Sequence, residues 1–165
     1  MNCKDLYEGE EVNGEPVFYV DENCTILYTG HVEDYFKDKL SWECDIVNGL
    51  QDGIEKQYYD FTGELESINE VKYNMGNGLA IEYYKNGKIK SISILVNNLN
   101  TDSYSYNEKG ELENVNIMNR NNTFGLNYSL IKDKLMVLRQ KYNLEKLNEE
   151  ILKYGKPIKY GKPIY

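Results

Sequence analysis

A chain of 165 residues is long enough to bury the core of one domain, and no stretch approaches the roughly 18 apolar residues that a membrane span requires. Sixteen tyrosines, against four phenylalanines and one tryptophan, favour β structure, because a tyrosine ring packs on a half-buried sheet while its hydroxyl stays in water. The net charge of −8 combines −13 in residues 1–66, where 17 acidic side chains face four lysines, with +5 in the remainder. This asymmetry disfavours nucleic-acid and membrane partners and favours a basic protein partner, with a merely solvated acidic surface as the alternative.

The first 27 residues begin with MNCKDLYEGEE, which has neither the basic n-region nor the apolar h-region of a secretory signal. We therefore expect a cytoplasmic protein. The three cysteines, Cys3, Cys24 and Cys44, are an odd number at spacings of 21 and 20 residues and form no CxxC pair. This pattern is typical of reduced, partly buried thiols rather than of a disulfide framework or a zinc site, so we expect no metal and no cofactor.

A sequence repeat begins near residue 28 and sets the expected architecture. Three glycines are each followed, five and six positions later, by an aromatic pair: Gly30 by Tyr35-Phe36, Gly53 by Tyr58-Tyr59, and Gly78 by Tyr83-Tyr84. Thr101, with Tyr104 and Tyr106, replaces the glycine in a fourth copy, and Gly125 with Tyr128 resembles a decayed fifth. The steps between copies are 23, 25, 23 and 24 residues, which predicts a tandem array of units of about 24 residues.

A second glycine lies nine or ten residues after the first in three copies, at Gly63, Gly87 and Gly110. Asn86-Gly87 predicts a type I′ hairpin turn, since both central residues of that turn need positive φ. Each unit is therefore expected to be a strand, a tight turn and a second strand. In the first copy Lys39 stands at the turn-glycine position, so that turn must differ in type or length.

Alternation along a strand divides the residues after each repeat glycine into two faces. One face carries Ile54, Lys56 and Tyr58 in one copy and Leu79, Ile81 and Tyr83 in the next, and we expect this face to be buried. The other face carries Glu55, Gln57 and Tyr59, then Ala80, Glu82 and Tyr84. Its tyrosines, flanked by carboxylates, favour cross-strand packing, with a ligand platform as the alternative.

After Leu130 the apolar spacing becomes helical, with Ile131, Leu135, Leu138 and Tyr142 on one stripe. Leu144, Leu147 and Ile151 lie almost opposite that stripe, so Asn143 is expected to end the first helix and cap a second. We expect these helices to cover the last hydrophobic edge of the array. The tail, YGKPIKYGKPIY, is a six-residue tandem duplication whose prolines predict an extended arm.

No catalytic constellation is recognisable in the sequence. His31 is the only histidine, and it follows a repeat glycine in the position that Ile54 and Leu79 occupy in the next copies. A residue of the sheet is therefore favoured over a catalyst, and no nucleophile elbow, phosphate loop or EF-hand accompanies it. We expect a protein that is not an enzyme.

The pattern Gly-x4-Tyr-Tyr-x2-Asn-Gly-x-Ile from Gly78 to Ile89 resembles the MORN repeat, in the bacterial variant found in YwqK-like antitoxins. Further copies begin at Gly53 and Gly30, so the resemblance covers about residues 28–112. It implies a mainly β fold and the function of an antitoxin or immunity partner of a secreted toxin, often a nuclease. The helical end and the duplicated tail depart from the plain repeat.

These observations predict a single domain, 1–165, with a meandering antiparallel sheet of tandem MORN-like hairpins closed by two C-terminal α-helices. Its parts are a divergent segment (1–27), hairpin repeats (28–128), capping helices (129–153) and an extended tail (154–165). The function predicted is a non-enzymatic immunity protein that binds a basic toxin, with a MORN scaffold for protein or lipid association as the alternative. The residues expected to bind the partner are Glu33, Asp34, Asp38, Glu43, Asp45, Asp52, Glu55, Tyr59, Asp60, Glu64 and Tyr84.

Overall fold

The computed structural model describes residues 1–123 and 128–156 and comprises two compact units, residues 1–76 and 77–165. The boundary between the units lies ten residues after the point, residue 66, at which the sequence analysis divided the charge. The first unit holds 18 acidic side chains and five lysines, a net charge of −13, and the second carries +5. The two units therefore carry net charges of opposite sign.

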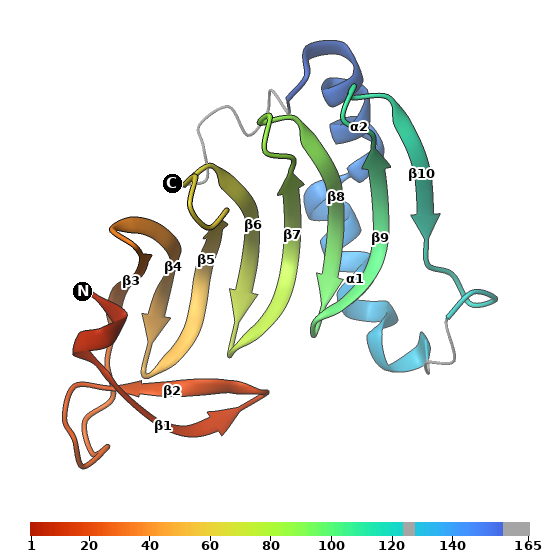
Figure 1. The fold of residues 1–165 in the computed structure, drawn as a ribbon. Helices are drawn as coiled ribbons and strands as arrows, with labels where there is room; N and C mark the ends of the chain where they lie inside the picture. Colours follow the sequence, from red (N-terminus) through yellow and green to blue (C-terminus); the bar gives the residue numbers. More distant parts are fainter. Residues whose placement is uncertain (124–127, 157–165) are drawn as a thin grey trace. The chain divides into compact units, whose positions relative to one another are not determined.

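Both units are built from antiparallel strands that pair in chain order (Figure 1). The repeat strands of the first unit are β3 (Gly30–Phe36), β4 (Lys39–Val47), β5 (Leu50–Tyr58) and β6 (Leu65–Lys72). Those of the second are β7 (Met75–Tyr83), which starts at the boundary, β8 (Ile89–Val96), β9 (Leu99–Tyr106) and β10 (Leu112–Ile117). The predicted mainly β fold of meandering hairpins, followed by two helices, is confirmed.

The repeat glycines share one unusual backbone conformation. Gly30, Gly53 and Gly78 have φ of 153°, 148° and 150°, values that side chains of L-residues rarely adopt. A Cβ at Gly30 would lie 2.5 Å from the Tyr28 hydroxyl, and one at Gly53 would lie 3.0 Å from the Asp45 Cβ. The sequence period is therefore a period of backbone geometry.

Two kinds of turn connect the repeat strands β3 to β10. The predicted type I′ turn at Asn86-Gly87 is wrong, because Gly87 has positive φ (78°) and Asn86 does not. Gly87 N–H donates to the Tyr84 carbonyl and Tyr84 N–H to the Lys88 carbonyl, both at 2.8 Å, as in a type I turn followed by a glycine bulge. Two-residue turns in which both φ are positive occur instead at Lys37-Asp38, Asn48-Gly49, Tyr73-Asn74 and Asn97-Asn98. The first of these confirms that the turn before Lys39 differs from its equivalents.

The N-terminal segment forms a hairpin that the sequence analysis did not predict. A 3-10 turn (Cys3–Asp5) precedes β1 (Tyr7–Val12) and β2 (Glu15–Tyr19). The Phe18 N–H donates to the Gly49 carbonyl at 2.9 Å. The buried Asn74 side chain donates to the carbonyls of Val12 and Glu15 and accepts from the Gln51 N–H. The hairpin thereby lies at the end of β4, β5 and β6 where Gly49 and Asn74 form turns (Figure 1).

The core of the first unit lies on one side of its sheet. It contains Val32, Cys44, Ile46 and Val71 from the strands, together with Leu6 and Phe18 from the N-terminal segment. The partly buried Trp42 packs against this cluster and donates from Nε1 to the Glu55 carboxylate at 3.0 Å. The expectation that the Ile54, Lys56 and Tyr58 face would be the buried one is therefore wrong for this unit.

In the second unit the equivalent face is buried, as predicted. Leu79, Ile81, Ile92 and Ile94 pack against α1 (Tyr128–Tyr142) and α2 (Leu144–Tyr154), which contribute six buried residues: Leu135, Leu138, Tyr142, Leu144, Leu147 and Ile151. The break at Asn143 is confirmed by its φ of 35° and by its side chain, which accepts from the Lys146 N–H. The helices contact β8 and β9 and thus cover a face of the sheet, whereas β10 exposes Val115 and Ile117.

An ion pair anchors the first helix to the sheet. Asp102, only 3% exposed, accepts from Arg139 Nε and Nη2 at 2.6 and 2.8 Å and from the Met118 N–H at 3.0 Å. Tyr154 ends α2, one residue past the predicted limit of the helices. The extended conformation predicted for the tail from residue 157 onward, and Gly125 of the predicted fifth copy, lie outside the described residues. Tyr128 of that copy begins α1 and does not lie in a strand, so its assignment to a hairpin repeat is wrong. Within the described ranges, no helix has the length and hydropathy needed to cross a bilayer.

Candidate functional site

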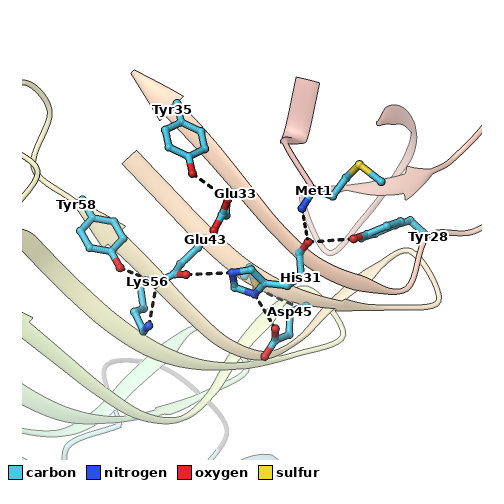
Figure 2. Close-up of polar contacts among 10 residues, drawn as sticks. Met1, Tyr28, His31, Glu33, Tyr35, Glu43, Asp45, Lys56 and Tyr58 are labelled. Carbon is cyan, nitrogen blue, oxygen red and sulfur yellow. Dashed lines mark hydrogen bonds and ion pairs between the residues drawn. The ribbon is translucent and has the colours of Figure 1, made fainter. Parts of the chain in front are cut away.

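Polar side chains from three neighbouring strands meet on the face of the first unit that lies opposite its core (Figure 2). The register places His31 opposite Asp45 and Glu33 opposite Glu43 across β3 and β4, and Glu43 opposite Lys56 across β4 and β5. Side chains directly opposite in antiparallel strands share a face of the sheet and come into contact. We name this set of five residues the polar face.

His31 lies between two carboxylates. Its Nδ1 is 2.9 Å from Asp45 Oδ1, and its Nε2 is 3.0 Å from Glu43 Oε2. Because carboxylates only accept hydrogen bonds, both contacts are hydrogen bonds only when both ring nitrogens carry protons. The contact with Asp45 raises the pKa of His31, burial opposes that rise, and the contact with Glu43 adds to it.

Glu43 is the centre of the polar face and is only 13% exposed. Its Oε1 accepts from Lys56 Nζ at 2.8 Å and from the Tyr58 hydroxyl at 2.6 Å, while its Oε2 faces His31. Burial raises the pKa of Glu43, but the hydrogen bonds from Lys56 and Tyr58 outweigh burial and lower it overall. The pKa of Tyr58 is raised, first by burial and then by its hydrogen bond to Glu43.

Hydrogen bonds also fix Glu33 and the backbone of His31 on β3. The Tyr35 hydroxyl donates to Glu33 at 2.9 Å, and this hydrogen bond raises the pKa of Tyr35. The backbone carbonyl of His31 accepts from the Tyr28 hydroxyl at 3.0 Å and from the N-terminal amine of Met1 at 3.2 Å (Figure 2). The chain start therefore fixes the backbone that carries the histidine.

The structure brings together three of the residues predicted to bind a partner, Glu33, Glu43 and Asp45. Asp34 alternates with them and lies on the core side, where it helps burial to raise the pKa of Cys3. Glu55 lies on the core side too, where Trp42 and Asn69 donate to it.

The remaining predicted residues lie elsewhere. Asp38, Tyr59, Asp60 and Glu64 belong to the turns, and Asp52 pairs in register with Lys72. Tyr84 belongs to the second unit and donates to the Tyr106 carbonyl at 2.7 Å.

Sequence reasoning missed the roles of His31, Lys56, Tyr35 and Tyr58 in this cluster. The usable signal was the repeat itself, because these residues lie one, three or five positions after a repeat glycine and so share one face. The strand between Lys39 and Val47 carries no repeat glycine, so its pairing with Glu33 and His31 could not be aligned from the sequence.

Two kinds of chemistry are available on the polar face. The fixed carboxylates can accept hydrogen bonds and pair with cations, and His31, Glu33 and Glu43 each offer one metal-ligating atom within 4.8 Å of the others. In the first unit, where every residue is described, no serine or cysteine contacts His31 in the manner of a nucleophile and its base.

No family model matches this chain, and no curated protein matches it either.

Proposed function

We propose that this chain is a non-enzymatic binding protein of the antitoxin or immunity type, which neutralises a basic protein toxin by binding to it. The observation that carries the proposal is the polar face. At repeat positions where the second unit buries Leu79 and Ile81, the first unit presents His31 and Glu33. His31 and Asp45 keep 44% and 53% of their side chains exposed.

The polar face is arranged in advance for binding. Each of its carboxylates has a partner within the protein: Glu33 has Tyr35, Glu43 has Lys56, and Asp45 has His31. A surface whose side chains are already ordered loses less conformational entropy when a partner arrives. Such a surface can hold charges at fixed positions, which gives selectivity among basic partners.

The charge of the first unit favours a basic protein as the partner. A net charge of −13 on 76 residues produces a field that attracts cations and raises the rate of encounter with a positively charged surface. The same field repels the phosphates of nucleic acids and anionic lipid, which counts against the alternative of a lipid-associated scaffold. Many toxin domains that act on nucleic acids are basic, which agrees with the function implied by the MORN resemblance.

The test uses the product of the gene adjacent to this one as the candidate partner. Cells producing that protein alone should be inhibited, and co-production of this chain should restore growth. Kinetic binding at low and at physiological ionic strength then locates the surface. The Glu33→Lys, Asp45→Lys double variant should associate about tenfold more slowly at low salt and lose most of its salt dependence.

Two matched variants serve as controls. Asp34→Lys with Asp38→Lys changes the charge of the same unit equally, but on the core side and at a turn. Glu108→Lys with Glu113→Lys makes the same change of charge at exposed positions of the second unit. The association rate of this variant should stay within about twofold of the wild-type rate. Equal rates for the wild type and the Glu33, Asp45 variant would contradict the assignment of the surface. A non-toxic neighbour that does not bind would contradict the function.

A further inference from the structure

We propose that His31, Glu33 and Glu43 form a binding site for a divalent transition-metal ion, for which Zn²⁺ is the representative. This inference goes beyond the proposed function, because it concerns the protein without any partner. No cysteine takes part in it, and the spacing of residues along the sequence does not suggest it. It rests on the hairpin register, which brings Glu43 beside two residues of β3.

The backbone places the three ligand residues. His31 and Glu33 are two residues apart on β3 and so point to the same side, and Glu43 lies directly opposite Glu33 on β4. One ligand atom from each lies within 4.8 Å of the others. Metal–ligand bonds of about 2.0–2.1 Å in a tetrahedral site separate ligand atoms by roughly 3.3 Å, so the most widely spaced pair must close by at most about 1.5 Å.

One pair of ligand atoms already has almost the required separation. His31 Nε2 and Glu43 Oε2 are 3.0 Å apart, so an ion inserted between them would widen the contact by only a few tenths of an ångström. Figure 2 shows the imidazole directed at Glu43, with Glu33 on the same side of the sheet. The largest adjustment falls on Glu33, which is at the edge strand.

The groups behind the three ligands are those that orient ligands in metal sites. A ligating histidine usually has its other ring nitrogen bound to a carboxylate or carbonyl, and here Asp45 contacts Nδ1 at 2.9 Å and leaves Nε2 for the ion. Tyr35 holds Glu33. Lys56 and Tyr58 occupy Oε1 of Glu43, so that Oε2 faces the shared centre. Each ligand is thus oriented by a side chain that does not itself need to bind the ion.

The ligand types select the class of ion. One imidazole with two carboxylates suits Zn²⁺ and its neighbours in the transition series, whereas Ca²⁺ takes six to eight oxygen ligands and Mg²⁺ keeps several waters. Three protein ligands leave at least one coordination position open to water, and the 44% exposure of His31 gives the ion a path to it.

The experiment is calorimetric titration of the chelator-treated, reduced full-length protein with ZnCl₂, and separately with MgCl₂ and CaCl₂. We expect one equivalent of Zn²⁺ to bind and neither of the other ions to compete. Because the chain has one histidine, its imidazole nitrogens give a single pair of NMR signals. Zn²⁺ should shift the ¹⁵N signal of Nε2 strongly and that of Nδ1 only slightly.

Variants separate this site from the three free thiols, which could also attract Zn²⁺. His31→Gln and Glu33→Gln should each weaken Zn²⁺ binding at least tenfold, and Asp45→Asn about tenfold through loss of orientation. Glu113→Gln, an exposed carboxylate on β10, should leave the affinity unchanged. A backbone amide NMR spectrum of each variant checks that the fold is retained.

The outcomes that overturn the proposal are distinct from those that overturn the proposed function. Zn²⁺ that binds no more tightly than Mg²⁺, binding that survives His31→Gln, or an unshifted Nε2 signal would each show that no site exists here. None of these results depends on a protein partner, so the binding function could stand while the metal site falls, or the reverse.

Discussion

The two units share one sequence period but place opposite kinds of side chain at its equivalent positions. One, three and five positions after the repeat residue, the second unit carries Leu79, Ile81 and Tyr83, and helices cover them. At the same positions the first unit carries His31, Glu33 and Tyr35 and adds no element over them. The repeat thus specifies a backbone, while the side chains and the cover on one face are free to differ. The same repeat backbone therefore carries a helix-covered hydrophobic face in one unit and a polar face in the other.

The largest expected effect comes from the covered face. Leu135 is completely buried between α1 and the sheet, so Leu135→Ala should lower the free energy of unfolding by about 3 kcal/mol. Met136 is the next residue on the same helix and is 53% exposed, so Met136→Ala should cost less than about 0.5 kcal/mol. Urea unfolding followed by circular dichroism measures both. Equal losses would mean that the helix does not pack as described.

The shared backbone is tested next. Gly53→Val puts a β-branched side chain at a φ of 148° and brings its Cβ to 3.0 Å from the Cβ of Asp45, so we expect a loss of about 2 kcal/mol. Gly87→Val meets nothing within 4 Å and suffers only from its φ of 78°, so about 1 kcal/mol is expected. Thermal unfolding of the two variants gives the ranking, and the reverse order would show that the repeat glycine is not a special position.

A smaller effect distinguishes the ion pairs of the two units. Lys56 and Glu43 are 15% and 13% exposed, so Lys56→Met removes the lysine from a largely buried carboxylate and should cost about 1.5 kcal/mol. Lys90 and Glu82 form a pair that is 51% and 48% exposed, and Lys90→Met should cost about 0.3 kcal/mol or less. Chemical denaturation in low and high salt compares them. Salt should weaken the effect of Lys90 more than that of Lys56.

The smallest effect is the pH dependence contributed by His31. Its pKa is raised in the folded state, so its stabilising contribution is complete below the ordinary histidine pKa of about 6.5 and disappears as pH rises through the folded value. Measured with a chelator present, the difference in unfolding free energy between wild type and His31→Gln should be largest at about pH 6 and smaller at high pH. Because the ring is 44% exposed, the difference should stay below about 1 kcal/mol. A difference that grows with pH would show that the contacts of protonated His31 with Asp45 and Glu43 do not stabilise the fold.

The sequence predicted the repeat geometry and the helices because both are periodic over short distances. Asn143 is an example, since its position between two opposed apolar stripes predicted the break that the structure contains. The turn at Asn86-Gly87 was predicted with the wrong type because the same dipeptide suits a type I turn with a glycine bulge, and only the strand register distinguishes the two.

The site was less accessible to sequence reasoning. Glu33, Glu43 and Asp45 were identified by charge, but charge could not say that Asp34 and Glu55 lie on the core side. Assigning faces required the pairing of β3 with β4, and the bulge after Asp34 shifts that register. Equivalent repeat positions also differ in burial. Leu79 is buried, whereas His31, at the same position of its repeat, is 44% exposed. Equivalence in the repeat therefore did not predict which face is buried.

Asn74 has a consequence for how the chain is made on the ribosome. Its side chain binds the carbonyls of Val12 and Glu15, which precede it by 62 and 59 residues. The N-terminal hairpin of a nascent chain must therefore wait, without these bonds, until residue 74 has left the exit tunnel. Since the first unit ends at residue 76, all of its residues can emerge while the helices that cover the second unit are still being translated.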